Sequence, residues 1–433
     1  MDRRKILIIG HNPISKGDNV GRTMGNIFSN YDKDELCQIY LRDGEPDFSI
    51  CDQYFYFNEI GILKSILKRN YETGYSVKQE DFGCENSSDN IKKVAVSKSS
   101  GLKSRIYEFG RGRTELIYLL RNIMWTLGKW DTSALRSWVK KQEPTSIFFF
   151  AGDYYFLFKI VEKIADEFNI PVYVYHVDEY YFTKKLCQKP GIDARIYAKH
   201  FKRMYDKAKM TFCISELMKD EYQTYFKKET ELLSNTSVNL LPERVNNSNV
   251  LNMNYFGNLS YQRWENLSLI STAVRILNER YDRKINFNIY SGEKSSDILD
   301  PFLKNPDVNF KGRISQEEVA EKIKESDILV HVESFDPESI VWVKHSVSTK
   351  VPDMLASNRL IFALGPKNVA CINYLQKHKT GVILNADNID RLVEEMKCLY
   401  ENDNFDEYKK NARELYYENH FPKRVKEILD KYL

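Results

Sequence analysis

Two hydroxyl side chains and a lysine lie just before an apolar run in the stretch HSVSTKVPDMLAS, residues 345–357. Ser348 and Thr349 are residue types that cap helices, and the apolar residues after them recur at helical spacing. A helix that begins here leaves backbone N–H groups unpaired, and such an end can bind an anion. Lys350 adds a positive charge at the same place. The stretch therefore predicts a binding site for a phosphate-bearing ligand.

Short apolar runs alternate with amphipathic segments along the first 240 residues, and these elements must position any site. The runs KILIIG, IFFFAG and VYVYHV are typical of buried parallel strands, because both faces of such strands are covered. Amphipathic segments at 156–168 and 192–208 predict helices. A series of this kind predicts a doubly wound sheet, which binds ligands beyond the carboxyl ends of its strands.

A second series follows the polar, turn-rich stretch at 241–252, which we interpret as a linker. Its strands include INFNIY, ILVHV and LIFAL, and its helices are expected at 264–280, 316–324, 350–356, 369–376 and 390–400. We predict an α/β protein with two Rossmann-like domains, 1–240 and 253–404, which face each other across a cleft. The helices of 405–433 are expected to cross back to the first domain.

The composition excludes several classes of protein. The chain has 433 residues, of which 42% are hydrophobic and 29% charged, so it is not a disordered chain. A net charge of +3 gives no reason to expect a nucleic-acid partner. The seven cysteines form no CxxC pair, and no Asp-x-Asp follows a strand, so we expect neither a metal nor a required cofactor. The first apolar run is too short for a signal peptide, and a cytoplasmic protein is expected.

The segment at 91–142 is unusually basic, with twelve Lys and Arg against three Asp and Glu. Trp125, Trp130 and Trp138 lie in the same segment. Basic residues mixed with tryptophan and leucine suit a helix in an anionic membrane interface, on the inner face of the membrane. The alternative is a helical insertion whose apolar face packs on its own domain.

Five stretches resemble, in their order along the chain, segments of the GT-B glycosyltransferases. The resemblance is closest to retaining, family-4-like enzymes of bacterial polysaccharide synthesis. In the second half, VNFKGRISQEEVAEKIKESDILVHVESF and STKVPDMLASNRLIFALGP resemble consecutive segments of the donor domain. NYFGNLSYQRWENL resembles the segment that opens that domain, and CISELMKDEYQTYF the one that closes the acceptor domain. GHNPISKGDNVGRTMGNIF resembles the first loop of the acceptor domain.

The resemblance implies that the ligand is a nucleotide-diphosphate sugar. Arg263 and Lys350 would bind its diphosphate, and Asp353 takes the place of a glutamate that binds the ribose hydroxyls. A carboxylate suits a diol because it offers hydrogen-bond acceptors only. The residues expected to bind the donor are Gly21, Arg22, Gly257, Arg263, Gly292, Gly312, Arg313, Ser348, Thr349, Lys350 and Asp353.

The expected catalytic residues are two histidines and an aspartate. Retaining members of the family carry an acid eight residues before the ribose-binding glutamate, and here that position is His345. His176 and Asp178 end the strand VYVYHV, where a histidine could act as a base or bind a sugar. A purely structural role is the alternative for His176.

The sequence thus predicts a metal-independent glycosyltransferase of cell-surface polysaccharide synthesis. Its donor is expected to be a UDP-sugar, and its acceptor a glycan or a lipid-linked sugar. Two alternatives stay open, because one fold hosts several functions. One is a nucleotide-sugar epimerase of the same fold, which needs no acceptor. The other is a non-catalytic scaffold or regulatory module, which the departures at His345 and Asp353 leave possible.

Overall fold

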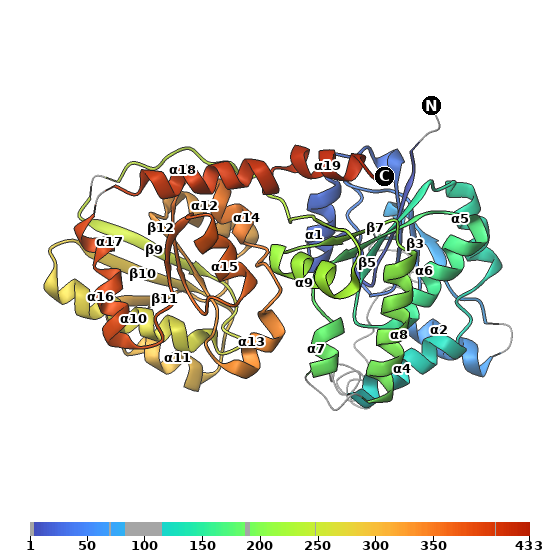
Figure 1. Cartoon of the computed structure of the whole chain (residues 1–433), viewed down its shortest axis with the longest axis horizontal. Helices are drawn as coiled ribbons and strands as arrows, with labels where there is room; N and C mark the ends of the chain where they lie inside the picture. The colour runs from blue at the N-terminus through green and yellow to red at the C-terminus, as the bar shows by residue number, and fades with distance from the viewer. Residues whose placement is uncertain (1–3, 69–70, 83–114, 187–190, 247, 403) are drawn as a thin grey trace. The chain divides into compact units, whose positions relative to one another are not determined.

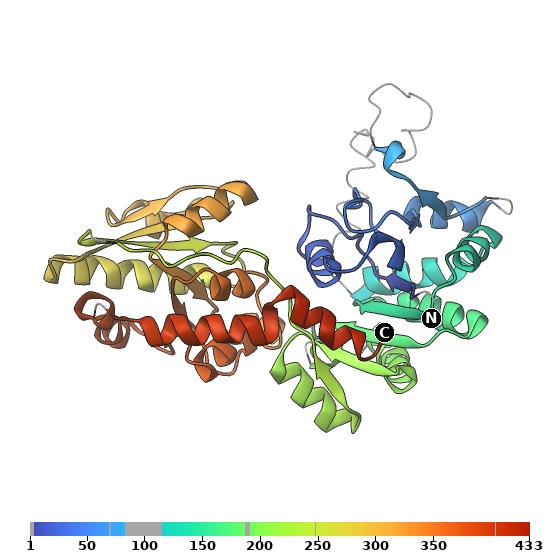
Figure 2. The ribbon, with the colours of Figure 1, turned by 90° about the horizontal axis from the view of Figure 1, so that it is seen from above.

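The computed structural model describes residues 4–68, 71–82, 115–186, 191–246, 248–402 and 404–433. The chain forms two compact units, which we describe separately (Figures 1 and 2). The first unit consists of Met1–Ile214, Tyr222–Leu233 and Lys426–Leu433, and the second of Ser215–Glu221 and Ser234–Val425. Helices α9 (Glu216–Phe226) and α19 (Pro422–Asp430) therefore each begin in the second unit and end in the first.

The first unit is built on an eight-stranded sheet in the order β4-β3-β2-β1-β5-β6-β7-β8. All neighbouring strands are parallel except β3 and β4. The order reverses between β1 and β5, so the carboxyl ends of these two strands form a topological switch point. The strands are β1 (Ile6–Ile9), β2 (Leu36–Tyr40), β3 (Tyr54–Tyr56), β4 (Tyr75–Val77), β5 (Ser146–Ala151), β6 (Val172–His176), β7 (Met210–Cys213) and β8 (Thr230–Leu232).

Helices cover this sheet because the central strands are apolar on both faces. Every residue of β5 and β6 is buried, as expected for strands inside a parallel sheet. The helices expected at 156–168 and 192–208 form as α6 and α8, within one residue of the expected bounds. The helices are α1 (Asn19–Phe28), η1 (Lys33–Glu35), α2 (Glu59–Leu67), η2 (Gln79–Asp81), α4 (Glu115–Leu127), α5 (Ser133–Gln142), α6 (Tyr155–Phe168), α7 (Tyr181–Leu186) and α8 (Ile192–Lys207).

Two of the three tryptophans expected at a membrane lie instead in the core of the first unit. Trp125 is fully buried and stacks on Phe156, with 4.6 Å between ring centroids. Trp138 is also buried, and Trp130 is half-buried. The membrane prediction is therefore wrong for Trp125 and Trp138, whose rings pack on their own domain. Residues 83–114, which hold much of the basic segment, lie outside the described residues.

The second unit contains a six-stranded, fully parallel sheet in the order β11-β10-β9-β12-β13-β14. The order reverses between β9 and β12, which places a second topological switch point at their carboxyl ends. The strands are β9 (Val250–Phe256), β10 (Lys284–Tyr290), β11 (Val308–Phe310), β12 (Ile328–Val332), β13 (Leu360–Leu364) and β14 (Gly381–Leu384).

Alternate residues of β13 supply the two hydrophobic cores of this unit. Leu360, Phe362 and Leu364 pack with the core beneath α10 and α16, whereas Ile361 and Ala363 pack with the core beneath α14, α15 and α18. The helix expected at 390–400 is divided into α16 and α17. The helices are α10 (Arg263–Arg280), α11 (Ser296–Leu303), α12 (Gln316–Glu325), α13 (Pro337–Val343), α14 (Val351–Ala356), α15 (Ala370–Lys377), α16 (Ile389–Met396), α17 (Cys398–Glu401), α18 (Asp406–Leu415) and the π-helical η4 (Tyr416–His420).

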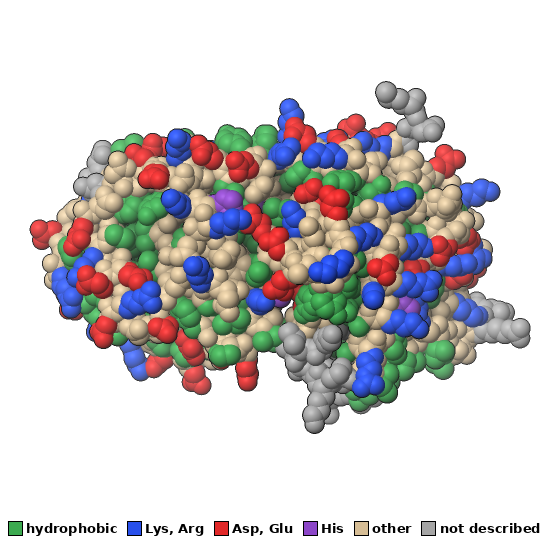
Figure 3. Space-filling model, in the orientation of Figure 1, with side chains coloured by type: hydrophobic (Ala, Val, Ile, Leu, Met, Phe, Trp, Pro, Cys, Tyr) green, Lys and Arg blue, Asp and Glu red, His purple; other side chains and the backbone are tan. Residues whose placement is uncertain are grey.

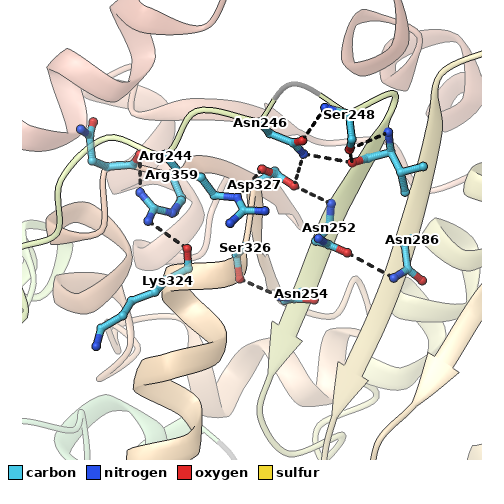
Figure 4. Close-up of polar contacts among 12 residues, drawn as sticks. Arg244, Asn246, Ser248, Asn252, Asn254, Asn286, Lys324, Ser326, Asp327 and Arg359 are labelled. Carbon is cyan, nitrogen blue, oxygen red and sulfur yellow. Dashed lines mark hydrogen bonds and ion pairs between the residues drawn. The ribbon is translucent and has the colours of Figure 1, made fainter.

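A network of polar side chains lies at the amino ends of these strands (Figure 4). The Asp327 carboxylate, before β12, accepts hydrogen bonds of 2.8 Å from Arg244 Nε, Asn246 Nδ2 and the backbone N–H of Asn252. The guanidinium of Arg359 donates to the backbone carbonyls of residues 242, 324, 357 and 358. This network ties residues 242–252 to the sheet.

No helix among the described residues is long and apolar enough to cross a membrane.

Candidate functional site

Several of the expected donor-binding residues come together at the carboxyl ends of β9 and β12. Val330 in β12 lies beside Tyr255 in β9, so Gly257, just after β9, and Glu333, just after β12, share this edge of the sheet. The switch point of a doubly wound sheet is the ordinary place for a ligand, because the loops after the two central strands diverge there.

Arg263, the first residue of α10, is held at this edge by Glu333. Its Nε and Nη2 lie 3.1 and 2.9 Å from Glu333 Oε2, and both side chains are largely buried. Burial would raise the pKa of Glu333, but hydrogen bonds from His331 and Arg263 lower it, so the carboxylate is ionised. The third nitrogen, Nη1, lies 3.2 Å from Asn258 Oδ1, on the exposed side. The guanidinium is thus fixed in direction.

His331 supplies a second positive group that the sequence did not single out. Its Nε2 lies 3.2 Å from the other oxygen of Glu333, Oε1. Burial would lower the pKa of His331, but the Cys371 sulfur and the Glu333 carboxylate raise it to about 9. The imidazole is therefore protonated at neutral pH, and together with Arg263 it exceeds the charge of Glu333.

Lys350 reaches the same place from the other side of Gly257. A β-carbon at residue 257 would collide with the Lys350 ammonium and with the Tyr255 hydroxyl. The ammonium also lies over the Tyr255 ring, 5.6 Å from its centroid. Glycine at 257 therefore makes room for Lys350. The structure brings Gly257, Arg263 and Lys350 together.

The helix start after Ser348 and Thr349 differs from the expectation. Helix α14 has six residues, begins at Val351 and carries Pro352 in its first turn. The N–H of Val351 already donates to the carbonyl of Ser348, and proline has no N–H. The prediction of several unpaired N–H groups here is wrong, so the positive charge at this point comes from the Lys350 side chain.

Asp353, the expected ribose ligand, is hydrogen-bonded to the segment that precedes β9. Its Oδ1 accepts hydrogen bonds from the Ser237 hydroxyl and the Asn239 amide. A ribose diol would have to replace these two donors with its own hydroxyls.

Gly292, Gly312 and Arg313 follow β10 and β11 at the same edge of the sheet. A β-carbon at residue 292 would lie 3.5 Å from Arg313 Cδ, so these two residues are neighbours. Gly312 adopts φ +72°, a backbone conformation that strongly favours glycine. Arg313 is thereby placed beside the loop after β10.

His345 belongs to a cluster centred on a glutamate that the sequence did not indicate. Glu221 Oε2 lies 2.7 Å from His345 Nε2, and its Oε1 lies 2.7 Å from Lys344 Nζ. Burial would raise the pKa of Glu221, but hydrogen bonds from Lys344 and His345 lower it. His345 is largely buried, and its backbone carbonyl accepts a hydrogen bond from Ser215. The imidazole is therefore held by α9.

The expected site residues of the first unit are buried or engaged within the protein. His176 is 2% exposed between the rings of Phe201 and Tyr222, and burial lowers its pKa to about 3. This burial argues against its role as a base and fits the structural alternative. Asp178 accepts a hydrogen bond from Tyr180, 3.2 Å away.

The loop before α1 uses its polar groups internally. The N–H of Gly21, expected near the sugar, donates to the N-cap residue Asp18 at 2.8 Å. Arg22 donates to Asn19 at 2.8 Å. A β-carbon at residue 21 would collide with Ser15, so the glycine serves close packing of α1 on this loop.

The switch point of the first unit holds a different set of residues, centred on Arg121, which sequence patterns missed. Arg121 Nη2, on α4, lies 3.1 Å from His11 Nε2 after β1, and its guanidinium stacks over Tyr154 after β5. Asp153 accepts a 2.7 Å hydrogen bond from Tyr118. Burial and the charge of Arg121 lower the pKa of His11 to about 3, so it is neutral. Polar groups of both signs thus lie at this switch point.

Comparisons with known proteins identify the fold. No family model and no curated protein matches the sequence. Among solved structures, a sucrose-phosphate synthase from Thermosynechococcus elongatus superposes with a TM-score of 0.57 at 10% identity, covering 99% of this chain and 98% of that one. The trehalose-6-phosphate protein from E. coli bound with UDP-2-fluoro glucose gives 0.59 at 9% identity and the same coverage. A glycosyltransferase from Rickettsia africae gives 0.57 at 11% identity, covering 100% and 98%.

The chain has the GT-B fold. The prediction of two Rossmann-like domains is therefore confirmed. At these identities the likeness concerns the fold alone, and the activity must be argued from the residues of the site.

Proposed function

We propose that the chain is a glycosyltransferase that moves a sugar from a UDP-sugar to a glycan or lipid-linked acceptor. Residues 253–404 would bind the donor and residues 1–240 the acceptor. The observation that carries the proposal is the pair of cations, Arg263 and Lys350, beside Gly257 at a switch point. Similarity to a protein bound with UDP-2-fluoro glucose supports the choice of nucleotide.

The geometry suits the departure of a nucleoside diphosphate. Transfer breaks the bond between the sugar C1 and the phosphate oxygen, and forms one between C1 and an acceptor hydroxyl oxygen, which loses its proton. Negative charge grows on the leaving phosphate, where Arg263 and Lys350 would stabilise it more in the transition state than in the ground state. Two fixed cations can do what a bound metal does elsewhere, so we propose metal-independent transfer. Among the described residues, no three His, Cys, Asp or Glu side chains gather as metal ligands.

The remaining donor contacts extend this assignment. We propose that Asp353 exchanges Ser237 and Asn239 for the ribose hydroxyls, and that Gly312 and Arg313 lie beside the base. His345, fixed by Glu221, would donate to a phosphate or a sugar hydroxyl. The resemblance to family-4-like enzymes supports a role in cell-surface polysaccharide assembly at the inner membrane face.

Calorimetry with UDP-, GDP- and dTDP-sugars tests the site. Arg263→Ala and Lys350→Ala should each weaken binding of the preferred donor by about 1.4 kcal/mol or more, which is tenfold in affinity. Arg280→Ala is the matched control, because Arg280 is exposed at the far end of the same helix. Unchanged affinity in both site variants would defeat the assignment. Turnover of the donor without acceptor to an epimeric sugar nucleotide would favour an epimerase, and binding without turnover a scaffold.

A further inference from the structure

Aliphatic side chains cover the solvent-facing sides of α2 and α4 in the first unit. Leu67 is 80% exposed, Leu127 is 64% exposed and Leu120 is 52% exposed. Single exposed aliphatic residues are normal, but a group on adjacent helices marks an interaction surface. We name this group the aliphatic face. It consists of Ile60, Leu63, Ile66 and Leu67 on α2, and Leu116, Leu120, Ile123 and Leu127 on α4.

The two helices lie side by side, so their exposed faces are neighbours. Arg121 on α4 pairs with Glu59 on α2, and the N–H of Lys129 after α4 donates to Ser65 Oγ at 3.0 Å. The opposite side of α4 carries Trp125, which is fully buried. The exposed residues of α4 recur at i, i+4, i+7 and i+11, which is one helical stripe. The aliphatic face therefore contributes little to the hydrophobic core of the first unit.

Exposed basic side chains lie on the two helices that pack beside α4, and we name them the basic flanks. Lys64 and Lys68 lie on or just after α2, and Arg195 and Lys199 lie on α8. Helix α8 packs beside α4, where Asn122 donates to Asp193 at 2.8 Å. The acids Glu59 and Asp193 are engaged within the unit. Figure 3 shows hydrophobic and basic side chains together at the end of this unit where Figure 1 labels α4.

We propose that the aliphatic face and its basic flanks dock the first unit on an anionic lipid surface. Anionic phospholipids offer acyl carbons to the aliphatic residues and negative headgroups to the lysines and arginines. A second copy of the chain fits less well, because a two-fold contact would bring the basic flanks of both copies together. The contact residues differ from the tryptophans expected from the sequence. The inference stands apart from sugar transfer, since it concerns residues outside the donor site.

Sedimentation of the full chain with vesicles, without any substrate, tests the docking surface. The chain should bind phosphatidylcholine vesicles that contain phosphatidylglycerol, bind pure phosphatidylcholine weakly, and lose binding at high salt. The double variant Leu120→Asp/Leu127→Asp should bind the anionic vesicles roughly tenfold less or weaker, because charge replaces apolar contact. Leu303→Asp is the control: Leu303 is 66% exposed on α11 in the second unit, and binding should not change.

Several results would overturn the proposal. One is equal binding by the wild type and the Leu120/Leu127 variant, and another is no binding by the wild type to either vesicle. Binding that appears only when residues 83–114 are deleted would show that the chain covers this face itself. A thermal melt checks the fold of each variant. The double variant Lys64→Glu/Lys68→Glu leaves the aliphatic face intact and should lose the preference for anionic vesicles. Donor binding measured in parallel separates a failure here from a failure of the proposed reaction.

Discussion

The two ends of the sheet in the second unit each hold a charged, mostly buried cluster, but the clusters are built differently. At the carboxyl ends, Arg263, His331 and Lys350 gather near one carboxylate, Glu333. Arg263 and the protonated His331 share the Glu333 carboxylate, and Lys350 lies beside them, so an anionic ligand can bind here. The contacts of Glu333 hold Arg263 and His331 in place.

At the amino ends, the charged groups bond mainly to side chains and carbonyls of the same network. Asp327 pairs with Arg244 and accepts two further hydrogen bonds, and Arg359 donates to four backbone carbonyls (Figure 4). A cluster of this kind stabilises the fold, because each group would be costly to bury alone. The comparison teaches that the structural network spends its donors on the protein's own carbonyls and on Asp327, whereas the carboxyl-end cluster places its cations beside a glycine at a switch point.

The largest effect is expected from Asp327→Ala, which should lower the stability of the fold and leave donor affinity nearly unchanged. Asp327→Ala removes the acceptor of three hydrogen bonds and leaves Arg244 without its ion pair, so the free energy of unfolding should fall by about 4 kcal/mol. Affinity for the UDP-sugar should stay within twofold or so, because the residue lies at the opposite end of the sheet. Urea unfolding and calorimetry measure the two quantities. A loss of donor affinity without a loss of stability would show that the amino-end cluster serves ligand binding as well.

Sequence patterns predicted the parts of this picture that are local. Several strands of each sheet follow from apolar runs, and the position of Gly257 and Arg263 follows from a strand, a loop and a helix start in one stretch. Lys350 was found because its charge lies at a helix start, even though Pro352 leaves that start with fewer N–H groups than expected.

The parts that sequence patterns missed depend on which elements become neighbours. In the sequence, His331 is one residue of an apolar strand. In the structure, where β12 lies beside β9, Glu333 contacts both His331 and Arg263. Trp125 belongs to a basic, amphipathic pattern, but its partner Phe156 comes from a different helix. Spacing along a chain carries no information about such pairs, so both the charged histidine and the buried tryptophan required the structure.

The charge on His331 gives a pH dependence specific to the carboxyl-end cluster. Its pKa is raised to about 9 by Cys371 and Glu333 against the effect of burial, whereas an unfolded histidine titrates near 6.5. The stability that it contributes is therefore fully present below pH 6.5 and is lost as pH rises from there through 9. The loss should reach at most about 3 kcal/mol.

Urea unfolding between pH 6 and 10 measures this loss, with His331→Gln as the comparison. The variant should be less stable at pH 6 and should show a flatter profile over this range. Parallel profiles for the two proteins would mean that His331 is neutral in the folded state, and the positive excess beside Arg263 would then be smaller than we infer.

Two glycines, Gly257 and Gly381, allow a comparison of the two ends of the sheet with the smallest expected effects. A β-carbon on Gly381, at the start of β14, would collide with the backbone carbonyl of Ile361, which the sheet holds in place. Gly381→Ala should therefore lower the free energy of unfolding by about 2 kcal/mol and leave donor affinity unchanged. On Gly257 the β-carbon would meet the end of the Lys350 side chain, which can swing away, and the hydroxyl of the buried Tyr255 ring, which has less room to move. Gly257→Ala should lower the free energy of unfolding by about 1 kcal/mol, less than Gly381→Ala, but weaken donor binding about tenfold, because the ammonium is displaced from the phosphate. If each variant instead loses both stability and donor affinity, ligand binding and stability do not depend on separate ends of this sheet.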